Sequence, residues 1–242
     1  MRTIENQILD HAALLGVFTA DDLQNSLEGS LPLDRSRLNW YLAHMADAGS
    51  VVRIARGTYT VSDDRRAFAP EVSEQAQSLY KQFNADFPEI KLCVYEGPWL
   101  LQFMHHLASN QITYIEIEKD VAETVFHRLK NEGKEVYFRP DEEFIYNYVN
   151  LGSPAIFVKN LISESPLQTI SGIKVPTLEK MLVDMYCDSD FFYLQGGEYH
   201  RIMRNARSRY TINITRMLRY ARRRNVSEAI KTIYENSQYD ID

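Results

Sequence analysis

The chain has 242 residues, of which 45% are hydrophobic and 25% are charged, and its formal net charge is −6. This composition is typical of a globular protein long enough to bury a sizeable core. The acidic balance excludes a protein that coats nucleic acid through its whole surface, but it allows a locally basic docking face.

The two cysteines and the hydropathy pattern disfavour a zinc-binding protein and a membrane protein. Cys93 and Cys187 each stand alone, without a C-x-x-C pair, so we expect buried free thiols and no cysteine zinc site. No stretch approaches the ~20 apolar residues that a membrane span needs, and the first residues lack a signal-peptide pattern. We therefore expect a cytoplasmic protein with no membrane partner.

The first sixty residues predict three helices in succession. Apolar residues at helical spacing predict the first over 3–15, and Thr19 is a typical N-cap for a short second helix. The third helix is expected over 34–47, with Gly49 after its end. Its inward stripe consists of Leu38, Tyr41, Leu42 and Met45.

A β-hairpin is expected to follow the third helix. The segment 51–55 is rich in β-branched residues and predicts a strand, 58–61 predicts the return strand, and Arg56-Gly57 between them is a turn signal. Three helices and a hairpin are the order of a winged helix-turn-helix, whose third helix enters the major groove of DNA. We expect double-stranded operator DNA to be contacted by Arg35, Ser36, Arg37, Trp40, His44, Arg53 and Arg56.

This small domain carries more acidic than basic residues, so other uses of the winged helix stay open. Winged helices also serve as protein-docking modules, and one copy would make few phosphate contacts. The acids, however, gather on the first two helices, away from the proposed docking face. We therefore expect DNA binding, with a homodimer on the DNA to raise its affinity.

The remainder predicts a second domain over 72–242, joined to the winged helix (1–62) by a polar linker over 63–71. Strands alternate with helices up to Pro176, and only helices follow it. The predicted fold class is therefore α+β, with an N-terminal winged helix followed by an α/β domain that ends in a helical bundle. Predicted strands cover 91–95, 112–117, 135–138 and 155–158, and predicted helices cover 72–87, 98–107, 120–131, 177–187, 197–209, 213–225 and 226–236.

Motifs for catalysis or cofactors are weak. There is no phosphate-binding glycine loop, and His105 and His106 are adjacent on a helix and so point apart, which disfavours a metal site. Glu179, Asp184 and Asp188 lie on or beside one helix, and the last two share a face. They could hold Mg²⁺ or act as acid and base, but we favour partners for nearby arginines. We expect no cofactor, no bound metal and no catalytic residues.

An arginine cluster occupies the interval from Tyr199 to Asn225, which contains no Asp or Glu. Three interpretations stay open: it extends the DNA footprint, it docks an acidic protein partner, or it pairs with the domain's own acids. The residues expected to form this partner or phosphate surface are Arg201, Arg204, Arg207, Arg216, Arg219, Arg222 and Arg223.

Several segments together resemble the AbiEi-type antitoxins of type IV toxin–antitoxin systems. They are RGTY at 56–59, GIKVPTLEKMLVD at 172–184, GGEY at 196–199 and NITRMLRYARR at 213–223. The resemblance implies a winged helix that represses its own operon and a C-terminal domain that counteracts a nucleotidyltransferase-like toxin, without a catalytic site. Two alternatives remain: a Mg²⁺-dependent enzyme acting on nucleotides or nucleic acid, and a protein-interaction module that does not bind DNA.

Overall fold

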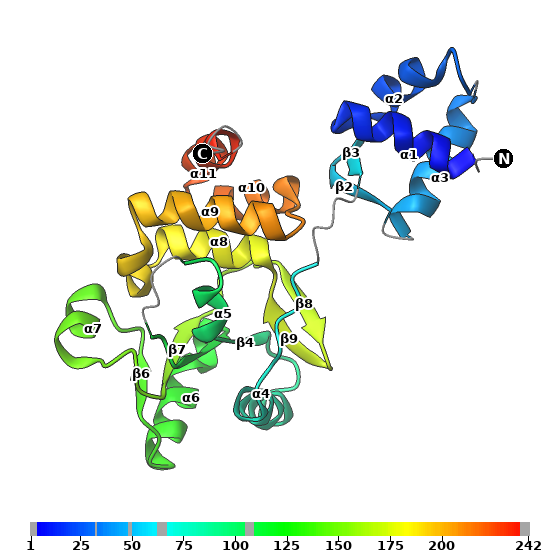
Figure 1. Cartoon of the computed structure of the whole chain (residues 1–242). Helices are drawn as coiled ribbons and strands as arrows, with labels where there is room; N and C mark the ends of the chain where they lie inside the picture. The colour runs from blue at the N-terminus through cyan, green and yellow to red at the C-terminus, as the bar shows by residue number, and fades with distance from the viewer. Residues whose placement is uncertain (1–3, 32, 48–49, 62–66, 105–108, 238–242) are drawn as a thin grey trace. The chain divides into compact units, whose positions relative to one another are not determined.

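The computed structural model describes the chain outside residues 1–3, 32, 48–49, 62–66, 105–108 and 238–242 (Figure 1). Residues 63–66 of the linker predicted over 63–71 lie outside the described residues. The chain divides into two compact units. Unit 1 comprises Met1–Ala67 with Arg209–Thr215, and unit 2 comprises Phe68–Ser208 with Arg216–Asp242. The predicted α+β class is confirmed, with a helical N-terminal part around a small antiparallel sheet, a central mixed sheet and C-terminal helices.

Unit 1 contains the three predicted helices and the predicted hairpin, which is the layout expected of a winged helix. A short strand precedes the second helix and was not predicted, because its three residues, the last of which is the cap residue Thr19, are too few to show a period. The sheet order is β1-β3-β2, and both pairings are antiparallel. The elements are α1 (Ile4–Leu15), β1 (Val17–Thr19), α2 (Ala20–Leu27), α3 (Arg35–Asp47), β2 (Val51–Ala55) and β3 (Thr58–Val61).

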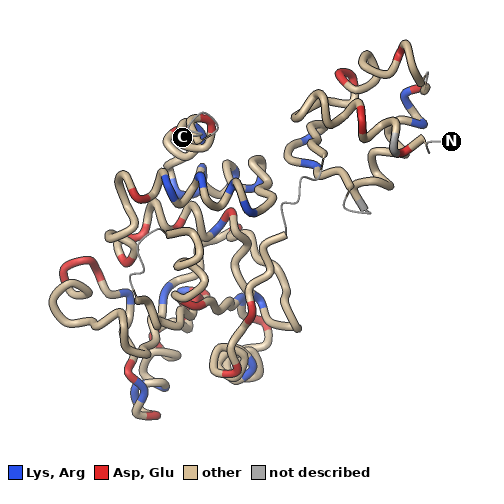
Figure 2. Tube along the Cα trace, in the orientation of Figure 1, with Lys and Arg blue, Asp and Glu red and all other residues tan. Residues whose placement is uncertain are grey.

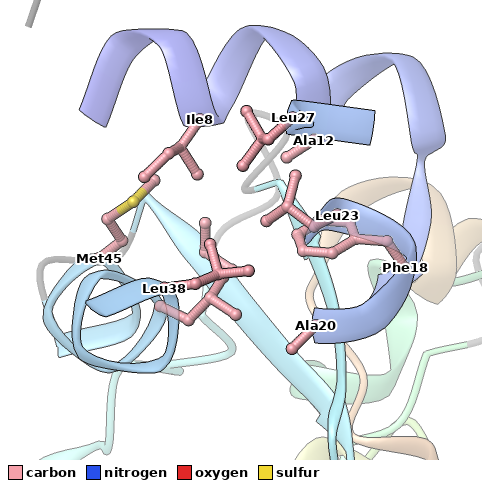
Figure 3. Close-up of a cluster of buried hydrophobic side chains, with 10 residues drawn as sticks. Ile8, Ala12, Phe18, Ala20, Leu23, Leu27, Leu38 and Met45 are labelled. Atoms are coloured by element: carbon pink, nitrogen blue, oxygen red, sulfur yellow. The ribbon is translucent and has the colours of Figure 1, made fainter. Parts of the chain in front are cut away.

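The core of unit 1 is a single apolar cluster to which all three helices contribute (Figure 3). Of the predicted inward stripe on α3, Leu38, Leu42 and Met45 are buried, whereas Tyr41 is half-buried at the edge of the cluster. Burying apolar side chains from every element makes the three helices one folded body. The buried members are Ile8, Ala12, Phe18, Ala20, Leu23, Leu27, Leu38, Leu42, Met45 and Val51.

The start of α2 is fixed by a capping box, as the Thr19 prediction implied. The Thr19 hydroxyl accepts a hydrogen bond from the Asp22 backbone N–H at 3.2 Å, and the Asp22 carboxylate accepts one from the Thr19 N–H at 2.8 Å. Two amides that the helix itself cannot satisfy are thereby paired. Just before β1, Gly16 adopts a φ of +69°, a conformation that favours glycine and lets the chain leave α1.

A mixed four-stranded sheet forms the centre of unit 2, in the order β4-β5-β7-β6. β4 runs antiparallel to β5, while β5, β7 and β6 are mutually parallel. All six residues of β5 are buried, as expected of a central strand covered on both faces. Helix α4 packs against β4, and α6 packs against β5, β6 and β7. The elements are α4 (Glu74–Asp86), β4 (Leu92–Glu96), β5 (Ile112–Ile117), α6 (Lys119–Asn131), β6 (Val136–Phe138) and β7 (Ala155–Asn160).

Helix α5 (Pro98–Leu101) is shorter than the helix predicted over 98–107. The Gln102 side chain donates to the Trp99 carbonyl at 2.7 Å, and the Phe103 amide bonds to Leu100, three residues back, instead of Trp99. The α-helical ladder therefore stops and a tighter turn follows. The predicted pair His105 and His106 lies outside the described residues.

Several elements of unit 2 were not predicted. They are helix α7 (Glu142–Tyr148), the hairpin of β8 (Leu167–Ile170) with β9 (Ile173–Pro176), and a 3₁₀ helix over Ser189–Leu194. Each is short, so none spans enough residues to establish a hydrophobic period. The hairpin means that the chain before Pro176 contains more strand than the sequence indicated.

The C-terminal part is helical, as predicted. Helix α8 begins after the N-cap Thr177, and the Tyr199 hydroxyl of α9 donates to the Leu182 carbonyl of α8 at 2.7 Å. Val226 occupies the N-cap of the last helix and makes no side-chain cap hydrogen bond. Within the described residues, no helix is long and apolar enough to cross a membrane. The helices are α8 (Leu178–Cys187), α9 (Gly197–Arg209), α10 (Ile214–Arg223) and α11 (Ser227–Asn236).

The capping box gives a test of the local order of unit 1. Replacing Thr19→Ala removes the hydroxyl acceptor and should lower the free energy of unfolding by about 1 kcal/mol. Thr19→Ser keeps an acceptor at the same place and serves as the control. Chemical denaturation followed by helical circular dichroism measures both. Equal stability of the Ala and Ser variants would contradict the role given to the cap.

Candidate functional site

The outer face of α3 is the first candidate site. Because Leu38, Leu42 and Met45 point into the core, the opposite side of the helix remains in solvent. Trp40, at the centre of that side, is 60% exposed, which is unusual for the largest aromatic side chain. Each residue predicted to contact DNA from this helix is exposed: Arg35, Ser36, Arg37, Trp40 and His44.

Aromatic rings give this face a rigid flat surface. The Trp40 and His44 rings stack with centroids 5.3 Å apart and an interplanar angle of 9°. Tyr41 meets Trp40 edge-on at 5.0 Å. The His44 ring also lies 3.8 Å from the Glu5 carboxylate of α1. Such a surface suits contact with another molecule, because stacked rings lose little conformational freedom on binding.

The two arginines at the start of α3 differ in their surroundings. Arg35 forms an ion pair with Asp21 of α2 at 2.7 Å and donates to Gln24 at 3.4 Å. The Arg37 guanidinium, in contrast, forms no hydrogen bond or ion pair with any described residue, while its backbone N–H donates to the Asp34 side chain at 2.9 Å. Arg37 is therefore the cation most readily available on this face.

The predicted wing residues are also exposed. The Arg53 Nε donates to the Ala55 carbonyl at 3.3 Å within β2, which steadies the side chain along the strand. Arg56 stands at the turn beside Gly57, whose φ of +74° closes the hairpin. Unit 1 thus brings the predicted contacts of α3 and of the β2–β3 hairpin into one folded body.

The arginine cluster of α9 and α10 is divided between internal and exposed positions. Arg207 lies over the Tyr234 ring, 4.6 Å from its centroid, and donates to the Tyr234 carbonyl at 3.0 Å. Arg216 lies 3.5 Å from Glu179, and Arg201 lies 3.5 Å from Glu198. The interpretation that these arginines pair within the domain is therefore confirmed for part of the cluster.

The remaining predicted members of the cluster differ in exposure. Arg219 and Arg222 are exposed and have no hydrogen bond or ion pair with any described residue. Arg223 is half-exposed, donates to Ser163 and lies 3.9 Å from Glu164. Arg204 is half-buried on α9. The exposed members are compatible with the other two interpretations, in which the cluster extends the DNA footprint or docks an acidic protein partner.

A buried cluster of charges in unit 2 was not predicted as a whole. The Lys180 side chain of α8 is 1% exposed, and its ammonium lies 2.6 Å from the Glu116 carboxylate of β5. It also pairs with Asp184 one turn further along α8. A buried cation needs such partners, since an unpaired charge away from water is very costly.

The cluster continues from Asp184 toward the C-terminal helices and β7. The Tyr220 hydroxyl and the Arg224 guanidinium each bond to Asp184 at 2.8 Å, and Arg224 also binds Asp188. On the other side, the Lys159 ammonium of β7 lies 2.6 Å from Asp188 and 2.9 Å from Asp190. We call the set Glu116, Lys159, Lys180, Asp184, Asp188, Asp190 and Arg224 the charge cluster.

The charge cluster borders a pocket of about 460 Å³. Burial raises the pKa of Asp184 to about 6, although Lys180 opposes this shift. Asp188 is affected differently: burial acts to raise its pKa, but Lys159 and Arg224 together lower it to about 2. Opposite charges therefore compensate one another within the cluster. No described group of three or more His, Cys, Asp or Glu side chains is arranged to hold a metal ion.

Part of the charge cluster had a signal in the sequence. Asp184 and Asp188 were predicted as arginine partners, which is confirmed, but the arginine that joins them is Arg224, outside the predicted contact set. Glu116 interrupts an otherwise apolar central strand, and Lys180 interrupts an apolar helix stripe. A charge on a face predicted to be buried is such a signal, because it requires a partner.

The two cysteines are free, as expected. Cys93 is buried, and its thiol lies 3.9 Å from Glu116. Burial raises the pKa of both thiols, that of Cys187 to about 12. Cys187 is only half-buried, in contrast to the prediction, and it lines the pocket beside the charge cluster. High thiol pKa values make both side chains poor nucleophiles.

Most of the chain matches the model of a known family. Residues 37–240 match the model of DUF6577, which is described as a family of unknown function. The matched part begins within α3 and runs through the C-terminal helices. A comparison with proteins of curated function finds no match.

The raised pKa of Asp184 predicts how the free energy of unfolding depends on pH. An acid whose pKa is higher in the folded state than its ordinary value of 3.8 binds more protons when folded, so its contribution to stability falls as pH rises from about 4 to about 6. Asp184→Asn removes this titration. The difference in free energy of unfolding between the wild type and this variant should therefore change across that pH window. A constant difference would contradict the raised pKa.

Lys180 gives a second test of the charge cluster. Replacing Lys180→Met keeps most of the side-chain volume but leaves Glu116 and Asp184 without their shared cation. We expect a loss of about 3–5 kcal/mol in the free energy of unfolding. Lys174→Met replaces the exposed residue of β9, and as the control it should change stability little. Thermal and denaturant unfolding measure both variants, and equal effects would contradict a central role for Lys180.

Proposed function

The chain belongs to the DUF6577 family, and for this protein we propose a function as a cytoplasmic DNA-binding transcriptional regulator of the antitoxin type. Its winged helix would bind operator DNA of its own operon, and its C-terminal unit would counteract a nucleotidyltransferase-like toxin. The single observation that carries the DNA-binding half is the exposed outer face of α3, with Arg37 and Trp40 in solvent and no described residue bonded to the Arg37 guanidinium.

The geometry of α3 supports direct contact with DNA. In helix-turn-helix proteins, the N-terminal residues of the recognition helix reach the base edges in the major groove. Arg37 occupies that end of α3, and an arginine can bond to guanine through two donors at once. Trp40, one turn further along, offers an apolar surface to a thymine methyl group.

The wing supports contact with the phosphate backbone. Arg53 and Arg56 are exposed on the β2–β3 hairpin, and arginine forks match phosphate oxygens well. The exposed arginines of unit 1 are few, so a single copy would release few counterions and bind weakly. Two copies on a repeated half-site would double these contacts, and we therefore propose that the protein acts on DNA as a homodimer.

The toxin-directed half of the proposal rests on the resemblance to AbiEi-type antitoxins. The segments that carry it form connected structure: 172–184 spans β9 and the first part of α8, 196–199 begins α9, and 213–223 forms α10. They meet around the charge cluster and the Tyr199–Leu182 hydrogen bond. In this proposal they build a scaffold for a protein partner.

We also propose that the protein has no catalytic role. The carboxylates considered for Mg²⁺-dependent chemistry, Asp184 and Asp188, are both bound by the Arg224 guanidinium, and Lys180 and Lys159 neutralise them further. A carboxylate that general acid–base or metal chemistry needs has to be accessible to its ligand. Here the charges of this pair are already matched within the protein.

DNA binding is tested with a gel shift of the full chain against the DNA upstream of its own gene. We expect salt-sensitive binding that prefers this fragment to a scrambled duplex. Arg37→Ala should reduce that preference by about 1–3 kcal/mol, because it removes a base contact. Arg53→Ala should weaken binding to both duplexes alike and lower the salt dependence, because it removes a phosphate contact.

A matched control is Arg128→Ala, which removes the same charge from α6 of unit 2 and should leave DNA binding unchanged. Binding without preference for the upstream fragment, or none at low salt, would overturn the regulator proposal. The antitoxin half is tested separately, by coexpression with a nucleotidyltransferase-like protein encoded beside this gene. Continued growth arrest despite coexpression would end that half alone.

A further inference from the structure

Helix α7 presents an aromatic surface that unit 2 does not cover. Ile145 is its only buried residue, so the short helix contributes little to the core. Tyr146 is 79% exposed, Tyr148 is 72% exposed and Phe144 is 39% exposed. Among the described residues of unit 2, the exposed large hydrophobic side chains all lie on this one helix. Such a concentration is typical of an interaction surface.

The same helix is acidic. Asp141, Glu142 and Glu143 follow one another at its start, and the segment 140–154 contains no Lys or Arg. All three acids are exposed. We call Asp141, Glu142, Glu143, Phe144, Tyr146 and Tyr148 the α7 surface. Its chemistry fits a partner that brings arginine or lysine, since these cations pair with carboxylates and stack on aromatic faces.

The end of α10 supplies that chemistry. Arg219, Arg222 and Arg223 are exposed, and Arg219 lies three and four positions before the other two, which places it next to both on the helix surface. Neither Arg219 nor Arg222 has a bonded partner among the described residues, and the interval from Tyr199 to Asn225 contains no acid. We call these three arginines the α10 surface. Figure 2 shows acidic positions on α7 and basic positions along α9 and α10.

The start of the α7 surface and the residue that follows the α10 surface line the same pocket. Asp141, at the start of α7, and Arg224, just after α10, both line the pocket of about 460 Å³ beside the charge cluster. The start of α7 and the end of α10 therefore lie near a common depression within unit 2. The exposed carboxylates lie on α7 and the exposed guanidinium groups lie on α10, so the two surfaces carry opposite charges.

We propose that this face of unit 2 binds a second copy of the chain, with the α7 surface of each copy against the α10 surface of the other. A two-fold axis places the acidic α7 surface of each copy against the basic α10 surface of the other, so both contacts form at once. Arginine and tyrosine are the residues most enriched at such contacts. The inference concerns unit 2 alone and holds whether or not unit 1 binds DNA.

Charge reversal tests the pairing directly. The double variants Glu142→Lys/Glu143→Lys and Arg219→Glu/Arg222→Glu each place like charges on both sides of the contact. Sedimentation velocity of the full chain at low salt should show a dimer for the wild type. Each double variant alone should show a dissociation constant raised by roughly 100-fold, because juxtaposed like charges are strongly unfavourable.

Mixing the two double variants is the decisive step. One variant then has basic residues on both surfaces and the other has acidic residues on both, so a mixed dimer regains both contacts. We expect the mixture to sediment as a dimer although neither variant does so alone. Glu123→Lys, at an exposed position of α6, is the control and should leave the wild-type dimer intact.

Several results would overturn the proposal. They are a monomeric wild type at every concentration, dimers of either double variant alone with wild-type affinity, and a mixture that stays monomeric. Complexes larger than a dimer would contradict the two-fold arrangement and indicate head-to-tail assembly. Tyr146→Ser with Tyr148→Ser tests the aromatic part without changing charge, and circular dichroism checks that each variant is folded. Unchanged dimerisation of this folded tyrosine variant would contradict the α7 contact.

Discussion

The buried ammonium of Lys180 is the constraint on which the organisation of unit 2 depends. A charge that is 1% exposed has to be matched by charges from elsewhere in the fold, and here they come from β5, from α8 itself and, through Asp184, from the residues around the end of α10. Lys159 extends the same matching to β7 and to the 3₁₀ helix. Such a cluster adds less to stability than an apolar core of equal volume would. It makes the packing register of the helices on the sheet specific, because a shift of one against the other would leave a buried charge without its partner.

Unit 1 is stabilised differently, without a buried charge cluster in the core that its described residues form. Its core is wholly apolar, and nothing in that core requires the outer face of α3 to carry Trp40 or Arg37. An exposed tryptophan stacked on a histidine contributes little to folding, so its presence on the helix expected to read DNA favours a binding role. Arg35 has an ion-pair partner within the domain, whereas Arg37 has none among the described residues. This difference distinguishes two arginines that look equivalent in the sequence.

Long elements with a clear period could be predicted, whereas contacts between distant segments could not. The helix α3, the strand β5 and the helix α9 followed from spacing alone. The short helix α7 and the β8–β9 hairpin did not, because four to seven residues cannot establish a period. In the candidate sites, exposure of Arg37, Trp40 and Arg56 follows from helix and hairpin geometry. The pairing of Arg224 with Asp184 joins residues that are 40 positions apart, and only the fold of the chain brings them together.

The proposed contact of α3 with DNA can be measured through its own tryptophan. The chain has two tryptophans: Trp40 is exposed on α3, while Trp99 is buried in unit 2 and its indole N–H donates to the Glu71 carbonyl at 3.0 Å. In a Trp99→Phe variant, fluorescence reports on Trp40 alone. Titration with DNA from upstream of the gene should give a saturable change in Trp40 emission at lower concentrations than titration with a scrambled duplex. Emission that stays constant, or that responds equally to both duplexes, would contradict the assignment of α3 as the recognition helix.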